Sequence, residues 1–298
     1  MINDFAGIYQ LAKEKGPGKL VVLAPEDREF MNAVKIARHE GYVEPIFIGN
    51  LEKMQIAAEG LDFNIDQIKK VFLNDPQEIA DYGIAMLFKK ETDLVSKGQI
   101  PTSYIYRAVI KEEQKRGIKN NISVTSLLEI PGCDHIVAVT DVGVNITPDY
   151  EAKAEIIKDA VSLMNLLGYD FPQVVVLSAN RGYGPTLQSY LDAQRLREEY
   201  GDGNGGFEIR PEHSVAELFD SVKVSPPHVF LAPELDTGNI MAKLNYVIPV
   251  KRCATLLCSA GPVAIPSRSD FTESIVRDMA LGAVLAARIK EKNIGLKI

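Results

Sequence analysis

The sequence predicts a three-layer α/β/α protein made of two subdomains. In the first half of the chain, short apolar runs alternate with segments whose apolar residues recur at helical spacing. Such alternation with short connections is typical of a parallel sheet that is covered by helices on both faces. A second series of strands and helices begins after a long predicted helix at residues 149–167. We therefore expect this helix to connect two α/β subdomains.

The elements of the first series begin with the apolar run 19–24, which is typical of a buried strand. The acidic residues Glu26 and Asp27 follow it and favour the start of a helix, because carboxylates stabilise the first helical turn. The other predicted strands lie near 45–49, 71–73, 93–96 and 135–140, and the predicted helices near 26–41, 51–59, 76–90 and 102–116.

The second series begins with the apolar strand 173–178, which leads into a loop at 180–185. Four glycines at 201–206 fit the letters of a dinucleotide-binding motif, but they follow a helix rather than a strand, so we interpret them as a loop. The remaining predicted strands are 228–232, 255–258 and 263–265, and the remaining helices are 186–200, one after Asn239, and 271–292.

The two predicted subdomains share the chain unequally. We assign residues 1–145 together with 262–298 to the first α/β subdomain, and residues 146–261 to the second. In open parallel sheets, ligands bind beyond the carboxyl ends of the strands. Functional residues are therefore expected where a strand passes into a loop.

The composition is that of an average globular protein, with 46% hydrophobic and 24% charged residues in 298. The net charge of −7 argues against nucleic-acid binding, which requires clustered Lys and Arg. It is compatible with an anionic small substrate, because a few local cations and amides can hold a phosphate. Neither a membrane-length apolar run nor a secretion signal is found, so we expect a cytoplasmic protein.

The cysteines and histidines give no sign of a metal site. The three cysteines, Cys133, Cys253 and Cys258, are not paired in a CxxC motif, and the four histidines have no ligand spacing. Small, buried thiols in a reducing compartment explain the cysteines. The sequence therefore predicts no metal.

Two polar clusters lie in the first half of the chain at predicted strand ends. Lys97 and Gly98 precede Thr102 and Ser103 at a helix start, where free N–H groups can bind an anion, although an ordinary helix cap explains the hydroxyls equally simply. The second cluster contains Asp141 and Asn145. Its carboxylate can orient a ligand or a cation, or it can close a turn.

Two further clusters lie in the second half. Glu234, Asp236, Gly238 and Asn239 precede a helix and can hold a substrate close to the backbone, or they can simply begin the helix. The segment 266–270 reads Pro-Ser-Arg-Ser-Asp. Its arginine can bind phosphate oxygens in a bidentate manner, and its serines can donate to a phosphate or an oxyanion. A helix cap is the structural alternative here as well.

Taken in order, the four clusters resemble the phosphate acetyltransferase/phosphate butyryltransferase family over nearly the whole chain. The resemblance is carried by Lys97-Gly98 with Thr102, Ser103 and Arg107, by the segment 140–149, by the segment 232–243 that ends in Lys243, and by the segment 266–270. The chain length and the Ser-Arg-x-Asp ending are more similar to the butyryl branch.

The resemblance implies a fold, a reaction and an assembly. The fold is that of isocitrate and isopropylmalate dehydrogenases, with two α/β subdomains and an active site in the cleft between them. The reaction is acyl-CoA + phosphate ⇌ acyl phosphate + CoA, in which a thiolate attacks directly within a ternary complex. Coenzyme A is then a substrate and no cofactor is bound. The assembly is a homodimer or a larger homo-oligomer.

The resemblance also implies roles for individual residues. Ser267 would donate to the oxyanion or the phosphate, Arg268 would anchor the phosphate, and Arg107 would be a second cation. The general base stays open between Glu273, Asp270 and neither of them. The resemblance implies substrate contacts for the rest of the motif residues, which are Lys97, Gly98, Thr102, Ser103, Asp141, Asn145, Gly238, Asn239 and Lys243.

Three positions depart from the family pattern. The acetyl branch has an aspartate seven positions after the motif serine, whereas this chain has Ser274. The family's Asp-Gly-Pro-Leu motif is missing near 206–214, and the loop at 180–183 differs. The alternative is therefore a regulatory homologue that binds CoA or acyl phosphate without turnover. A nicotinamide-dependent dehydrogenase is disfavoured, because the sequence offers no metal-binding aspartate set.

Overall fold

The computed structural model describes residues 1–119, 121–179, 187–212, 214 and 226–292. The chain divides into two compact units. Unit 1 comprises Met1–Asp4 and Ser123–Arg252, and unit 2 comprises Phe5–Ile122 and Cys253–Ile298. None of the described helices is long and apolar enough to cross a membrane.

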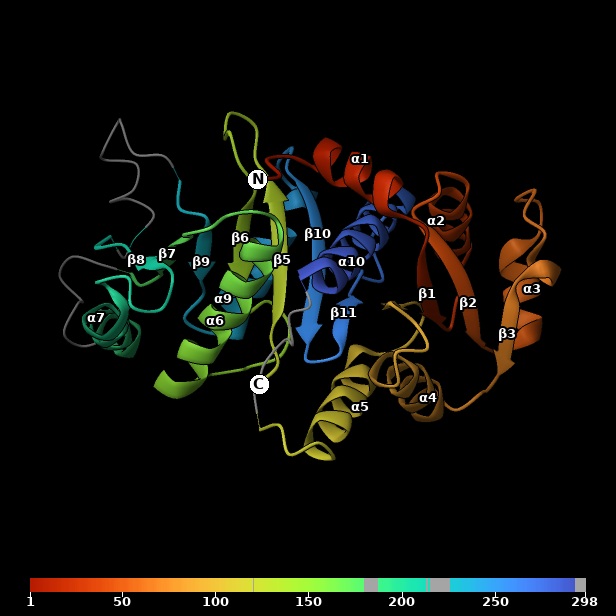
Figure 1. The fold of residues 1–298 in the computed structure, drawn as a ribbon, viewed down its shortest axis with the longest axis horizontal. Helices are drawn as coiled ribbons and strands as arrows, with labels where there is room; N and C mark the ends of the chain where they lie inside the picture. Colours follow the sequence, from red (N-terminus) through yellow and green to blue (C-terminus); the bar gives the residue numbers. More distant parts are fainter. Residues whose placement is uncertain (120, 180–186, 213, 215–225, 293–298) are drawn as a thin grey trace. The chain divides into compact units, whose positions relative to one another are not determined.

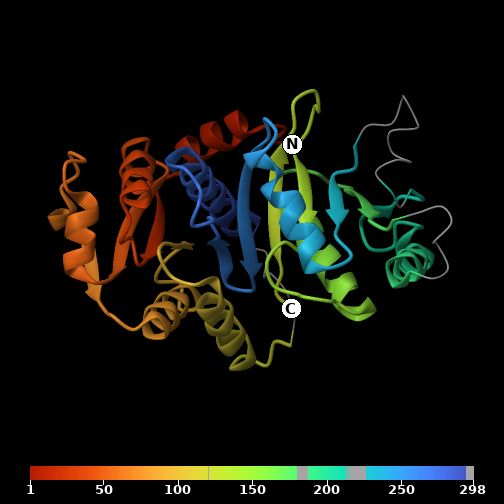
Figure 2. The same cartoon turned by 180° about the vertical axis from the view of Figure 1, so that it is seen from behind.

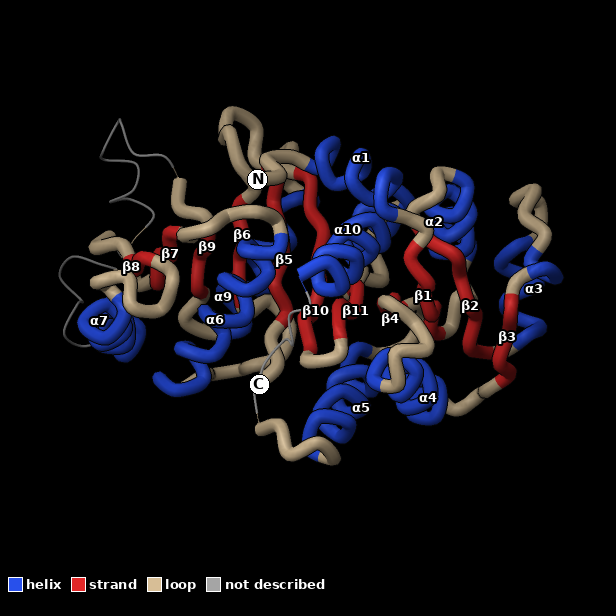
Figure 3. The backbone as a smooth tube through the Cα atoms, viewed as in Figure 1, coloured by secondary structure: helices blue, strands red, loops and turns tan. Residues whose placement is uncertain are grey.

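The sheet of unit 2 has five parallel strands and one antiparallel strand (Figures 1 and 3). The strand order is β3, β2, β1, β4, β11, β10. Their bounds are β1 Gly18–Leu23, β2 Val43–Gly49, β3 Lys69–Phe72, β4 Leu94–Lys97, β10 Lys251–Cys258, whose first two residues belong to unit 1, and β11 Gly261–Ala264.

Helices cover both faces of the unit 2 sheet. Val21 and Leu23 point toward Gly83 of α4, whereas Leu94, which is in register with Leu20, points toward Gly282 of α10. Because side chains alternate along a strand, α4 and α10 lie on opposite faces. The helices of unit 2 are α1 Phe5–Lys15, α2 Arg28–His39, α3 Leu51–Ala58, α4 Pro76–Phe88, α5 Thr102–Gln114 and α10 Thr272–Lys292, with a short 3-10 turn η1 at Ile65–Gln67.

The sheet of unit 1 is smaller and begins with an antiparallel pair, β5 and β6. The order continues through β9 and β7 to β8, all parallel to β6. Helices α6 and α9 lie on opposite faces of this sheet (Figures 1 and 2). The bounds are β5 Val124–Glu129, β6 Val137–Thr140, α6 Tyr150–Leu166, β7 Gln173–Val176, α7 Gln188–Tyr200, β8 Glu208–Ile209, β9 Val229–Leu231, α9 Leu235–Ala242 and η3 Lys243–Tyr246.

The α/β prediction is confirmed, but the structure differs from it in its elements and in the direction of some strands. Helix α1 and strands β5 and β8 were not predicted. The sheets are also not entirely parallel, because β10 and β11 form a hairpin around Ser259 and Ala260, and β5 and β6 form a second antiparallel pair. Hairpins bring consecutive strands together without a crossover helix, which an alternating pattern cannot reveal.

The boundaries between the two units also lie at other residues than the sequence predicted. The sequence placed the boundaries after residues 145 and 261, whereas the structure has them after Ile122 and after Arg252. Strands β5 and β6 pair with each other, and β6 pairs with β9, so residues 124–140 belong with unit 1. The N-terminal residues Met1–Asp4 belong there too, since Ile2 accepts a hydrogen bond from the Tyr169 hydroxyl.

Candidate active site

Two of the predicted clusters meet at one edge of unit 2. Strands β4 and β11 are parallel neighbours, so their carboxyl ends lie at the same edge of the sheet. Lys97 ends β4, and the segment 266–270 follows β11. The Lys97 ammonium donates to the Pro266 carbonyl at 2.9 Å and to the Gly98 carbonyl at 3.4 Å. The structure thereby brings the first and the fourth cluster together.

Lys97 is a buried cation whose surroundings favour its neutral form. Only 3% of the residue is exposed. Burial lowers the pKa of Lys97 to about 8, with a smaller lowering by Arg268 that Asp270 and Asp278 oppose. Its hydrogen-bond partners are backbone carbonyls, and no ion pair of the described residues includes it. A buried ammonium without a carboxylate partner is costly, so this position suits an anionic ligand.

The segment 266–270 forms a closed turn. The Asp270 carboxylate accepts from the Ser267 N–H at 2.7 Å, and the Asp270 N–H donates to the Ser267 carbonyl at 3.1 Å. The hydroxyls of Ser267 and Ser269 are 3.1 Å apart. Asp270 is buried, Ser267 is half-buried and Arg268 is exposed. The turn therefore presents the serine and the arginine and uses the aspartate to hold its shape.

Gly98 has a structural reason to be glycine. A Cβ at this position would lie 2.3 Å from the Ala24 carbonyl oxygen and 2.5 Å from that of Leu23. The Gly98 N–H donates to the Leu23 carbonyl at 2.7 Å. Close approach of β1 and the loop after β4 requires glycine whether or not a ligand binds.

The start of α5 carries the other members of the first cluster. Pro101 stands at the cap position, and no side chain caps the helix. Thr102 is half-buried, while Ser103 and Arg107 are exposed. The Arg107 guanidinium lies over the Tyr104 ring, 4.7 Å from its centre. Uncapped N–H groups at a helix start can bind an anion, as the sequence analysis proposed.

At the start of α10, a carboxylate of the protein itself, that of Glu29, accepts hydrogen bonds from the first helical residue. The N–H of Thr272 donates to the Glu29 carboxylate at 3.1 Å, and its hydroxyl donates to the same group. These hydrogen bonds lower the pKa of Glu29. Glu273 is exposed, whereas Ser274 is buried and accepts from the Arg277 guanidinium at 2.8 Å. The sequence analysis missed Glu29, which lies 243 residues from its partner.

In unit 1, Asp141 closes the loop after β6. Its buried carboxylate accepts from the backbone N–H of Val124 at 3.0 Å, of Gly143 at 2.9 Å and of Asn145 at 2.7 Å. The Asn145 side-chain amide and the Val144 N–H donate to it as well. A carboxylate with so many donors organises its own loop, which favours the turn-closing alternative for Asp141.

Helix α9 packs directly on this loop. A Cβ on Gly238 would lie 2.0 Å from the Asp141 carbonyl oxygen, so only glycine fits. The Asn239 amide donates to the Val142 carbonyl at 3.0 Å. The structure thus brings the second and third clusters together in unit 1. Lys243, by contrast, is exposed and follows the last residue of α9 as its C-cap.

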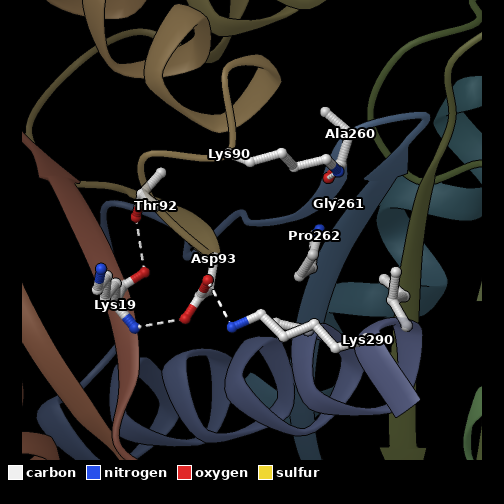
Figure 4. A pocket seen from close by; sticks show the side chains of 10 residues that line it. Lys19, Lys90, Thr92, Asp93, Ala260, Gly261, Pro262 and Lys290 are labelled. Carbon is white, nitrogen blue, oxygen red and sulfur yellow. Dashed lines mark hydrogen bonds and ion pairs between the residues drawn. The ribbon is translucent and has the colours of Figure 1, made fainter. Parts of the chain in front are cut away.

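A hollow of about 530 Å³ in unit 2 contains none of the predicted site residues (Figure 4). Lys19 at the start of β1, Asp93 just before β4 and Gly261 at the start of β11 line it, so it lies at the amino ends of the strands. Lys290 pairs with Asp93 at 2.7 Å, and Lys90 donates to the Ala260 carbonyl at 2.8 Å. These lysines lie at or just after the carboxyl ends of α10 and α4, where cations stabilise a helix.

One predicted feature lies outside the described residues: the loop at 180–183 that departs from the family pattern. The departure at Ser274 lies within them, in the first turn of α10.

Comparison with known proteins gives one family. Residues 72–200 match the family model described as "Phosphate acetyl/butaryl transferase". A probable phosphate butyryltransferase of Bacillus subtilis is 25% identical over 292 residues, with 94% of this chain and 96% of the relative covered. A phosphate acetyltransferase of Thermotoga maritima is 26% identical over 293 residues, with 94% of this chain and 98% of the relative covered.

Solved structures show the same fold. A branched-chain phosphotransacylase from Enterococcus faecalis matches with a TM-score of 0.75 and 20% identity, covering 90% of this chain and 98% of that chain. A 4-hydroxythreonine-4-phosphate dehydrogenase from Burkholderia phymatum matches with a TM-score of 0.55 and 10% identity, covering 90% and 98%. The expected likeness to a dehydrogenase-type α/β fold is confirmed.

Proposed function

Because this chain belongs to the phosphate acetyl/butyryl transferase family, as its motifs predicted, we propose that it transfers an acyl group between coenzyme A and phosphate. The observation that carries the proposal is the buried ammonium of Lys97 beneath the 266–270 turn. A buried ammonium without an ion-pair partner among the described residues, next to an exposed arginine and a serine hydroxyl, is suited to a phosphate or acyl phosphate.

Within this proposal, Ser267 and Arg268 act on the reacting groups. The CoA thiolate attacks the carbonyl carbon of the acyl phosphate, the C–O bond to phosphate breaks, and phosphate leaves with the bonding electrons. Ser267 donates to the oxyanion that forms during attack, and Arg268 binds the phosphate oxygens. The closed turn supports these roles, since Asp270 fixes the Ser267 backbone while Arg268 stays exposed.

Glu273 is a better candidate for the general base than Asp270. The Asp270 carboxylate is engaged by the Ser267 N–H, so protonating it would disturb the turn. Glu273 is exposed in the first turn of α10 and has no hydrogen bond or ion pair to any described residue. A Glu273→Gln variant is expected to lower kcat without lowering thermal stability, whereas Asp270→Asn should lower thermal stability together with activity. Equal, small effects of both changes would mean that neither residue is the base.

One assay of thiol release tests both the proposed acyl transfer and the preferred acyl chain length. Purified protein is incubated with acetyl-, propionyl- or butyryl-CoA, with and without phosphate, and released thiol is measured. We expect phosphate-dependent release, and the butyryl-like ending of the 266–270 motif favours butyryl-CoA. No phosphate-dependent release from any of the three substrates would reject the proposed reaction.

A second candidate function is binding of CoA or acyl phosphate without turnover. Ser274 favours it, because this residue stands where the acetyl branch has its base and is buried against Arg277. Saturable CoA binding in calorimetry, combined with no thiol release in the assay above, would establish this alternative.

The proposal includes three expectations from the sequence: CoA acts as substrate without a bound cofactor, the protein works in the cytoplasm, and it assembles as a homodimer or larger homo-oligomer. Sedimentation analysis of the full chain tests the assembly directly, and a monomer at micromolar concentration would contradict it.

A further inference from the structure

The loop between β5 and β6 in unit 1 begins with a tight turn that fixes Cys133. The Cys133 N–H donates to the Ile130 carbonyl at 3.0 Å, and Gly132 has a positive φ of 84°. Pro131 precedes this glycine, which is the sequence of a type II turn. The turn sets the position of the cysteine side chain before any ligand binds.

Three side chains that can bind a metal meet directly after this turn. The Cys133 sulfur, a carboxylate oxygen of Asp134 and a ring nitrogen of His135 all lie within 4.8 Å of one another. The sulfur is 3.6 Å from His135 Nδ1, and Nδ1 is 2.8 Å from Asp134 Oδ1. In a tetrahedral zinc site the sulfur and nitrogen ligands are roughly 3.5 Å apart, given the usual metal–ligand distances. The sulfur–nitrogen separation already has this value.

The imidazole ring of His135 is held in place by its surroundings. Only 6% of His135 is exposed, and its ring packs on His228 with centres 4.9 Å apart. The next residue, Ile136, donates its N–H to the Tyr169 hydroxyl at 3.1 Å. His228 itself accepts from the Gln173 N–H through Nδ1, so its Nδ1 is not available to a metal. Support by neighbouring groups is typical of metal-binding histidines.

A hollow of about 470 Å³ lies beside the cluster and is acidic. Its lining includes the carboxylates of Asp4, Glu129 and Asp134 and the single ammonium of Lys251, which pairs with Glu129. The chain's N-terminus lies near this loop (Figures 1 and 2). The hollow offers room for water ligands and a net negative charge that attracts a cation.

The same residues are poorly arranged for nucleophilic catalysis. In a cysteine–histidine–aspartate triad, the carboxylate and the sulfur bind opposite nitrogens of the ring. Here Asp134 binds Nδ1, and the sulfur is 3.6 Å from Nδ1 and 3.8 Å from Nε2. The sulfur is therefore nearer to the nitrogen that the carboxylate already occupies. A thiol, an imidazole and a carboxylate this close together, with Cys133 and Asp134 lining a hollow, are better suited to a cation.

We propose that the β5–β6 loop binds a zinc-class divalent cation through Cys133, Asp134 and His135, with water from the adjacent hollow completing a tetrahedral site. The site lies at the end of unit 1 where β5 ends and β6 begins, whereas Asp141 follows the other end of β6. It is independent of the proposed acyl transfer. The sequence predicted no metal because its cysteines and histidines show no ligand spacing, whereas here the side chains of three consecutive residues converge.

Cobalt substitution tests the site. The metal-free full-length protein is titrated with Co²⁺, and the absorption of a cobalt–thiolate bond is followed. We expect one equivalent to bind, with an intense charge-transfer band and the visible bands of tetrahedral cobalt, and Zn²⁺ to displace it. Cys133→Ser should abolish the charge-transfer band, and Asp134→Asn should weaken affinity about 10-fold or more. Both substitutions avoid the buried His135 ring, and circular dichroism confirms that each variant is folded.

A second His–carboxylate pair provides the matched control. His39 lies 3.5 Å from Glu40 on the surface of unit 2, so a His39→Gln variant removes a similar pair outside the loop. This variant should bind cobalt like the wild type. Absence of a thiolate band in the wild type, or an unchanged band in Cys133→Ser, would overturn the proposal. Loss of the band in His39→Gln would overturn it as well.

Discussion

Lys97 combines a formal charge with almost complete burial, and its hydrogen-bond partners are backbone carbonyl groups. Since the folded pKa of Lys97 is about 8, below the ordinary lysine value of 10.5, the unfolded state binds the proton more tightly. The resulting loss of stability is fully present below pH 8, decreases as the pH rises above 8, and disappears near the unfolded pKa. A side chain that lowers stability is retained for another reason, and binding of an anion is such a reason.

We therefore expect Lys97→Met to raise the free energy of unfolding at pH 7 by up to about 3 kcal/mol while abolishing acyl transfer. The gain should shrink between pH 8 and pH 10, as the wild-type side chain becomes neutral in the folded state. Urea unfolding at both ends of this range measures the effect. Lys243→Met, at an exposed lysine, is the control and should change stability little. A marked loss of stability in Lys97→Met would show that the ammonium is mainly structural.

Arg268 is exposed on the closed turn, so its loss should affect ligand binding more than folding. We expect Arg268→Ala to raise the KM for phosphate roughly 10- to 100-fold, the equivalent of losing a charge-assisted bidentate contact. The KM for acyl-CoA should change far less. Steady-state kinetics with each substrate varied in turn measures both constants, and Arg107→Ala provides the comparison. An unchanged KM for phosphate would contradict the anchoring role.

At the scale of elements, helix α10 begins against a carboxylate from a distant helix. Glu29 of α2 accepts from the N–H and the hydroxyl of Thr272, and α10 then runs across the sheet to Lys292. The carboxylate stabilises the positive end of the helix. Because hydrogen bonds lower its folded pKa, this stabilisation is present above the unfolded value of 4.5 and is lost as the pH falls through the folded value.

Glu29→Gln should accordingly lower stability by roughly 0.5 kcal/mol at pH 7, a small value because Glu29 is exposed to solvent. The difference from the wild type should be smaller at a second, acidic pH below 4.5, because protonation of Glu29 removes the charge that stabilises the helix start. Thermal unfolding at the two pH values tests this, with the exposed Glu14→Gln as control. A difference that persists at low pH would mean that Glu29 stabilises the helix start through packing or hydrogen bonding rather than through its charge.

Helix α4 approaches the sheet so closely that one position must be glycine. A Cβ on Gly83 would lie 2.3 Å from Leu23 Cδ2 and 3.1 Å from Val21 Cγ1. Alanine normally stabilises a helix by about 1 kcal/mol relative to glycine, but overpacking costs about 1–3 kcal/mol. We expect Gly83→Ala to be destabilising, as measured by urea unfolding. Adding Leu23→Val, which shortens the contacting side chain, should recover part of the loss. A stabilised single variant would contradict this packing.

Local patterns explain which elements the sequence could predict. Strand β1 is a run of apolar residues, and α4 starts at Pro76 after the capping residue Asp75, so both are visible in the sequence. Strand β5 was missed because Thr125 and Ser126 interrupt its apolar residues, although both are buried. Helix α1 was missed because only Phe5, Ile8 and Ala12 face the core.

Contacts between distant residues explain what could not be predicted in the candidate site. The order of the four clusters indicated the family, which is confirmed, but the roles of the individual residues stay predictions. Burial of Lys97 depends on the Pro266 carbonyl, 169 residues away, and no periodicity contains that contact. The engagement of Asp141 by its own loop is local, and the frequent turn-closing role of aspartate could have indicated it.

At the scale of the whole molecule, the chain enters each unit twice. Unit 1 takes Met1–Asp4 and Ser123–Arg252, while unit 2 takes Phe5–Ile122 and the residues from Cys253 onward. Domains usually fold during synthesis in the order in which they are translated. Here unit 1 is complete once Arg252 has been made, whereas unit 2, most of which precedes Ser123 in the chain, still lacks α10.

Helix α10 is therefore synthesised only after unit 1 is complete, and this helix covers the face of the unit 2 sheet that holds Leu20 and Leu94. Until α10 is made, one apolar face of the unit 2 sheet stays exposed in the nascent chain, although unit 1 can already be folded. Such a face is a binding site for chaperones and a site of aggregation. The speed at which residues 253–292 are translated, and the supply of chaperones, should consequently affect how much of the chain folds correctly.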